Sequence, residues 1–192
     1  MKREELEDYI LTVEQIEDMK YHQRLSVKTF SKQHAVFSYA PDSPFWDGIE
    51  VLSRLIDRMG VNKGTEEFFR AAAVESPERY IKAVQFSNTY RAIVDYLYNP
   101  LFDVVQGCSD DTYSDVLDYF PLLGAQMVNA ALAGELPKVN YKEFYNGENY
   151  VGMRLEDARD KYFKTYARKV LERMDDEEYE KRKAEKKTAQ NW

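Results

Sequence analysis

Pairs of glutamates near the amino terminus have a spacing that could hold a metal ion. Two pairs show the Glu-x-x-Glu pattern, Glu4 with Glu7 and Glu14 with Glu17. Residues three apart share one face of a helix, so each pair could present two carboxylates to a divalent cation. A hydrolase site would need a second acidic motif, and the candidate formed by Glu5 and Asp8 overlaps the first pair. A carboxylate–metal hydrolase is therefore the least favoured function, and we expect no metal site and no cofactor.

The sequence also lacks the signatures of nucleophilic and phosphate chemistry. Its two histidines are His22 and His34, its one cysteine is Cys108, and it has no Gly-x-Ser-x-Gly motif. Nucleophilic catalysis needs a base within reach of a nucleophile, and the spacing of these residues provides none. Residues 60–65 have the wrong spacing for a Walker loop and are typical of a connection between helices. The sequence contains no motif that identifies a family, and it favours a protein that is not an enzyme.

A long segment without positive charge is the strongest feature of the chain. Residues 92–137 contain no lysine or arginine, within a chain whose net charge is −7. Its aspartates, which we expect on one exposed surface, are Asp95, Asp103, Asp110, Asp111, Asp115 and Asp118. Local pairing cannot neutralise these charges. They need solvent on an exposed face, the basic residues 19–41, or a protein partner with a basic surface, and we carry the last of these forward as the prediction.

A second segment, residues 19–41, has cations and no acids. Its candidate binding residues are Lys20, Arg24, Lys28, Lys32, Phe37 and Tyr39. Cations with interleaved aromatics can bind a nucleic-acid backbone, and cations near the carboxyl terminus could extend the patch: Arg154, Arg159, Lys161, Lys164, Arg168 and Lys169. The net charge of −7 opposes this function. A nucleic-acid-binding regulator is therefore the second choice. In another arrangement, residues 19–41 meet the acidic segment of a second copy and form a homo-oligomer.

Apolar periodicity predicts a mainly α, single-domain multi-helix bundle that positions these segments. We expect a helical globular domain over 1–174 and a charged helical extension or frayed tail over 175–192. Alternation over 25–39 predicts a small β-hairpin. Thr65 can cap the amino terminus of one helix, and the helix-breaking pair Asn99–Pro100 should stop another. The expected helices cover residues 3–20, 42–60, 65–73, 77–98, 110–120, 121–134 and a long final segment from about 153, whose end projects into solvent.

The location expected from the sequence is the cytoplasm, or the host cytoplasm if the protein is viral. No apolar run approaches the ~20 residues of a membrane helix. The first residues are charged, without the apolar stretch of a signal peptide. A single cysteine excludes an intrachain disulfide.

Aromatic residues are abundant, with 15 tyrosines, 10 phenylalanines and 2 tryptophans. A buried tyrosine hydroxyl needs a hydrogen-bond partner, so we expect several tyrosines at the surface, where they are typical of protein interfaces. We therefore predict a non-catalytic helical protein that binds another protein through an acidic surface and exposed aromatics. This composition suggests a bacteriophage-type accessory protein, an inhibitor, an adaptor or a virion-assembly component.

Overall fold

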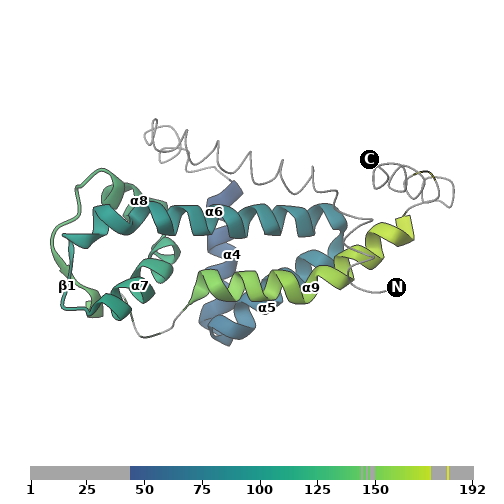
Figure 1. Ribbon diagram of the computed structural model, residues 1–192, viewed down its shortest axis with the longest axis horizontal. Coiled ribbons are helices and arrows are strands. Elements are labelled where there is room, and N and C mark those ends of the chain that lie inside the picture. Colours follow the sequence, from purple (N-terminus) through teal and green to yellow (C-terminus); the bar gives the residue numbers. More distant parts are fainter. Residues whose placement is uncertain (1–43, 144, 146, 148–149, 174–180, 182–192) are drawn as a thin grey trace, which may run out of the picture.

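The computed structural model describes residues 44–143, 145, 147, 150–173 and 181 (Figure 1). These residues are mainly α-helical, as the sequence predicts. The predicted helix over 3–20 and the hairpin over 25–39 lie outside the described residues, as does the extension over 175–192 apart from Lys181. The helices are α4 Pro44–Met59, α5 Val61–Glu75, α6 Pro77–Phe102, α7 Asp110–Tyr119, α8 Ala125–Leu132 and α9 Val151–Arg173.

The two longest of these helices, α6 and α9, run alongside each other (Figure 1), with α5 packed against both and α4 packed against α5. α7 and α8 gather around the carboxyl end of α6 (Figure 1). There β1 (Val105–Gln106) pairs in parallel with β2 (Val139–Asn140), with Val105 opposite Val139. We call residues 92–137 the acidic end. We call α4, α5, α9 and the part of α6 before residue 92 the helical body.

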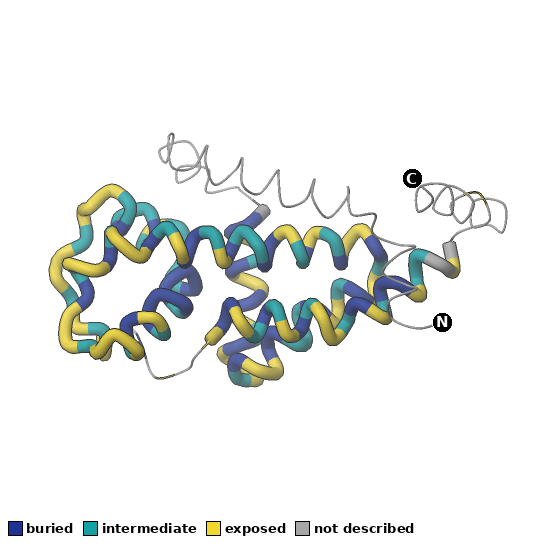
Figure 2. Tube along the Cα trace, in the orientation of Figure 1, coloured by how far each residue is buried: buried dark blue, intermediate teal, exposed yellow. Residues whose placement is uncertain are grey.

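One hydrophobic core joins the helical body to the acidic end. Figure 2 shows buried positions on the sides of the helices that face one another. Two tyrosines in this core donate their hydroxyls to backbone carbonyls, Tyr80 to Arg159 and Tyr90 to Asp118, each at 2.6 Å. These bonds offset the cost of burying a hydroxyl and tie α6 to α9 and to α7.

The predicted helix over 42–60 is confirmed as α4. Its core-facing side chains recur at three- and four-residue steps: Phe45, Ile49, Leu52 and Ile56. The helix ends before Gly60, whose φ of 78° glycine adopts at little cost. Trp46 is also buried, whereas Met59 at the end of the helix is exposed.

The predicted helix start at Thr65 is wrong, because α5 begins at Val61. Thr65 is fully buried, and its hydroxyl donates to the carbonyl of Val61 at 2.9 Å inside the helix. Gly64 lies where α5 meets α4, and a Cβ there would be 2.8 Å from the backbone nitrogen of Ile56. The first turn of α5 therefore packs closely against α4, a tertiary contact that helix propensity alone does not reveal.

Serine residues cap the amino termini of α6 and α7. Ser76 Oγ accepts a hydrogen bond from the N–H of Arg79 at 3.2 Å, and Pro77 opens α6 as predicted. α7 begins at Asp110, also as predicted, with Ser109 as its cap. These starts follow from local hydrogen bonding, which is why the sequence indicates them.

The predicted helix end at Pro100 is wrong, because α6 continues to Phe102. Pro100 lies inside α6, where proline removes one backbone hydrogen bond and crowds the carbonyl four residues before it. The following residue, Leu101, is fully buried in the core, which favours continuing the helix. The continuation places Phe102 one helical turn beyond Tyr98, on the same face of α6.

The region from 120 to 134 is less regular than the single helix expected from Pro121. A 3₁₀ turn, η1 (Phe120–Leu123), comes first, and Gly124 with a φ of 87° separates it from α8. Gly134 follows α8 with a φ of 70°, close to the predicted end. A second 3₁₀ turn, η2 (Tyr141–Glu143), follows β2.

The described part of the predicted carboxyl-terminal helix is confirmed as α9. Four-residue spacing on α9 would allow the ion pairs Asp157–Lys161 and Asp160–Lys164, but both aspartates and Lys161 have other partners. The structure has Arg154–Asp157 at 3.1 Å, Arg159–Asp160 at 3.0 Å and Lys161–Glu66 at 2.7 Å. The last pair links α9 to α5, a contact that sequence spacing within one helix cannot reveal.

Candidate functional site

Two stacked aromatic side chains are exposed at the carboxyl end of α6. The rings of Tyr98 and Phe102 have centroids 6.3 Å apart and an interplanar angle of 21°. Tyr98 is 50% exposed and Phe102 is 59% exposed. Large exposed apolar side chains that lie together are more informative than scattered ones, because they mark interaction surfaces. We call this the aromatic pair.

Tyr113 of α7 supports the aromatic pair. Its ring meets Tyr98 edge-on at 5.5 Å and Phe102 edge-on at 5.6 Å. Tyr113 is itself buried, and its hydroxyl donates to the carbonyl of Tyr98. Burial raises the pKa of this hydroxyl well above its usual value, so it stays a donor at neutral pH. Tyr113 therefore holds the two exposed rings in a fixed position.

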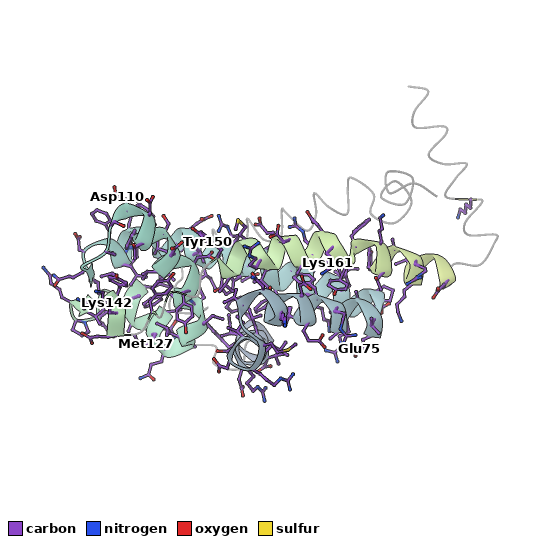
Figure 3. The ribbon with its side chains drawn as sticks, turned by 90° about the horizontal axis from the view of Figure 1, so that it is seen from below. Glu75, Asp110, Met127, Lys142, Tyr150 and Lys161 are labelled. Carbon is purple, nitrogen blue, oxygen red and sulfur yellow. The ribbon has the colours of Figure 1, made fainter. Side chains whose placement is uncertain are left out.

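Exposed carboxylates lie at the same end of the molecule as the aromatic pair. Asp95 lies one helical turn before Tyr98, and Asp103 directly follows Phe102 as the cap of α6. Asp110 and Asp111, in the first turn of α7, are also exposed (Figure 3 labels Asp110). The fold thus brings four of the six predicted aspartates to one end of the molecule.

The end of α6 adds to the negative potential there. A helix carboxyl terminus carries partial negative charge, which nearby cations usually offset. The last turn of α6 has no basic residue, and its cap is Asp103. The last cation along α6, Arg91, already pairs with Asp118 at 3.3 Å. Two lysines, Lys138 and Lys142, follow the acidic end in sequence, and both are outside its 92–137 range.

Asp115 is half-buried and engaged within the molecule. The hydroxyls of Tyr145 and Tyr150 hydrogen-bond to its carboxylate. Burial raises the pKa of Asp115, and the two tyrosine hydrogen bonds partly oppose that rise. Figure 3 shows Tyr150 near the start of α9, so this cluster fastens the segment before α9 to α7. Asp115 is therefore a poorer docking residue than the four exposed aspartates.

Asp118 does not belong to an exposed surface, which corrects the sequence prediction. It is 4% exposed. Its carboxylate accepts a hydrogen bond from the N–H of Gly152 at 2.8 Å and one from Arg91 at 3.3 Å. Burial raises the pKa of Asp118, and both bonds lower it. Because Gly152 lies in the first turn of α9, Asp118 caps that helix from α7, and its role is structural.

The second predicted binding segment is not placed by the structure. Lys20, Arg24, Lys28, Lys32, Phe37 and Tyr39 lie outside the described residues, as do the glutamate pairs near the amino terminus. Of the cations proposed to extend this segment, Arg154, Arg159 and Lys161 already have carboxylate partners. The described cations of α9 therefore form a partly neutralised surface.

Sequence reasoning missed Phe102. With the helix expected to stop at Asn99–Pro100, Phe102 fell in a separate short apolar segment, a turn of helix or a buried connector, rather than one turn after Tyr98 on the same helix. The four-residue spacing of the two aromatics was a usable signal, because it places them on one face if α6 continues.

In the part of the chain that the structure describes, no group of three or more His, Cys, Asp and Glu side chains is placed to hold a metal ion. None of its helices combines the length and apolar character needed to cross a bilayer. Cys108 is half-buried and has a free thiol. In comparisons with known proteins, no family model, curated protein or solved structure matches this chain.

Proposed function

We propose that this protein binds another protein, and that the acidic surface around the aromatic pair is where it binds. The single observation that carries the proposal is the exposure of Tyr98 and Phe102 among carboxylates, in a segment without lysine or arginine. Aromatic side chains dominate binding energy at protein interfaces. Surrounding charges of one sign set the on-rate and select partners of the opposite sign. The surface is suited to a basic protein segment.

The contrast with three exposed apolar side chains of α4 and α5 supports this location. Val51, Met59 and Val74 are exposed on the helical body. Residues 44–91, which contain them, carry seven acids and seven bases, so the charge around them is balanced. The acidic end combines aromatic area with charge of a single sign. The narrower role suggested by composition, a bacteriophage accessory or assembly protein, stays a prediction.

The test is a titration with a defined basic peptide. A fluorescein-labelled peptide with arginines and lysines separated by alanines is the probe, and its anisotropy reports binding. Asp95→Lys with Asp103→Lys should weaken binding by about tenfold, since both carboxylates flank the aromatic pair. A lysine in place of Asp103 also complements the negative end of the α6 dipole, so the fold should persist.

The matched control makes the same change in net charge elsewhere. Asp57→Lys with Asp160→Lys alters two exposed acids of the helical body. At physiological salt, charges more than about 8 Å apart are largely screened, so this variant should bind the peptide like the wild type. Equal weakening by the two double variants would show that binding follows net charge alone and would contradict the proposed surface.

A further inference from the structure

We infer that the partner segment inserts an arginine, rather than a lysine, at the aromatic pair. The inference rests on the proposed function and specifies the chemistry of its ligand. The juxtaposition that carries it is an exposed Tyr98–Phe102 pair with a carboxylate one turn before it and another directly after it. Three features of this place select a planar cation.

The first feature is the aromatic area itself. A cation is attracted to the face of a tyrosine or phenylalanine ring within about 6 Å of its centroid, and arginine is the more frequent partner. Guanidinium is planar and weakly hydrated, so it can lie flat on a ring at a low desolvation cost. A lysine ammonium is a compact, strongly hydrated point charge. Half or more of each aromatic residue is open to such a contact.

The second feature is the position of the carboxylates. Asp95, Tyr98 and Phe102 follow one another at three- and four-residue steps, which is one stripe along α6. Asp103, the carboxyl-terminal cap of α6, directly follows Phe102 at the helix end, beside this stripe. A guanidinium lying on the pair can direct its N–H groups to a carboxylate in a bidentate manner, which an ammonium cannot do.

The third feature is that no side chain of the acidic end competes for the site. Residues 92–137 supply no cation, and Arg91 is held by Asp118. Tyr113 keeps the rings in place through two edge-on contacts and one hydrogen bond. The site is therefore ordered before binding, which reduces the entropy lost when the partner binds.

The experiment compares two labelled peptides that differ only in having arginine or lysine at every cationic position. Wild type should bind the arginine peptide about threefold to tenfold more tightly than the lysine peptide. Tyr98→Leu with Phe102→Leu keeps apolar side chains and all charges but removes the rings. This variant should bind both peptides equally, while Phe102→Tyr, which keeps a ring, should retain the preference for arginine.

The outcomes separate the inference from the proposed function. Equal binding of the two peptides by wild type would overturn the inference and leave the proposed function standing. Failure to bind either peptide would contradict the proposed function as well. Side chains this exposed contribute little to stability, so the leucine variant should stay folded. Its circular dichroism spectrum shows whether a loss of peptide binding comes from unfolding.

Two other occupants of the surface would overturn the assignment to a separate arginine-bearing partner. A wild-type mass above that of a monomer in light scattering, lost in the leucine variant, would show that a second copy covers the pair. Tighter peptide binding after Lys28→Gln with Lys32→Gln would show that the basic segment of the same chain occupies it. We expect a monomer, and no gain from the glutamine changes.

Discussion

Tyr80 in the helical body stacks on Tyr166 at 4.6 Å and donates its hydroxyl to the carbonyl of Arg159. At the acidic end, Tyr98 and Phe102 also stack, yet half or more of each remains exposed. Both regions lie on α6 and are built from similar side chains. The first arrangement is complete within the chain, whereas the second leaves aromatic surface open to a partner.

Charge separates the two regions in the same way. Ion pairs in the helical body join side chains of the chain itself, such as Arg79–Glu75 at 3.0 Å and Lys161–Glu66 at 2.7 Å. The acidic end supplies carboxylates and no cation from its own sequence. The comparison shows that composition alone does not tell which aromatic and charged side chains are paired within the chain. What distinguishes the proposed binding surface is that the fold leaves its aromatic side chains half exposed.

The largest expected effect is the loss of stability when a buried aromatic of the helical body is truncated, compared with an exposed one at the acidic end. Phe69→Ala should lower the free energy of unfolding by about 3–5 kcal/mol, because Phe69 is fully buried in the helical body. Phe102→Ala should cost less than about 1 kcal/mol, because the residue is mostly exposed. Urea denaturation followed by circular dichroism measures both. Losses of similar size would mean that Phe102 is a core residue and would remove the distinction.

The next effect tests the contact between α7 of the acidic end and α9 of the helical body. Asp118→Ala removes the acceptor for the N–H of Gly152 and the partner of Arg91. Leaving these donors unpaired should lower the free energy of unfolding by about 1–3 kcal/mol. Hydrogen exchange should speed up in the first turn of α9. Unchanged exchange there would show that Asp118 does not cap this helix.

A smaller effect concerns pH. Burial raises the pKa of Asp118 above its usual value of 3.8, so its charged form is disfavoured in the folded state. That cost is present above the raised pKa and is relieved as pH falls through it. Wild type should therefore gain stability relative to Asp118→Asn as pH falls from neutral toward the ordinary carboxylate range. A difference that stays flat or reverses with pH, in paired urea titrations, would contradict the assigned shift.

The smallest effect is expected at the exposed ion pair between α9 and α5. Lys161 and Glu66 are in contact, but their side chains are 54% and 46% exposed. Solvent and salt screen such pairs, and ordering two long side chains opposes the attraction. Lys161→Ala should leave the denaturation midpoint close to that of wild type and of the control Lys164→Ala. A drop as large as that of Asp118→Ala would show that exposed pairs also hold the helical body together.

Local signals in the sequence were sufficient for much of the fold. The apolar stripe and final glycine of α4, the Ser76–Pro77 start of α6 and the periodicity of α9 all act within one or two helical turns. Predictions failed where tertiary contacts outweighed local preference. Burial of Leu101 favours a helix that continues past Pro100, and the contact at Gly64 accompanies an earlier start for α5.

The candidate site was only partly accessible from sequence for the same reason. The absence of cations over residues 92–137 is visible in the sequence and indicated the region. The separation of exposed Asp95 and Asp103 from buried Asp118 depends on the N–H of Gly152, a residue far along the chain. The exposure of Tyr98 and Phe102 depends on how α7 places Tyr113 against them. Contacts of this kind between separate helices leave no local or periodic pattern in the sequence.

We propose that the acidic end, and not the helical body, is the binding surface. Amide chemical shifts of the ¹⁵N-labelled full chain, recorded while the arginine peptide is added, test this proposal directly. We expect the largest shift changes between Asp95 and Asp111, at the end of α6 and the start of α7. Largest changes in α4, α5 or α9, or no changes at all, would contradict it.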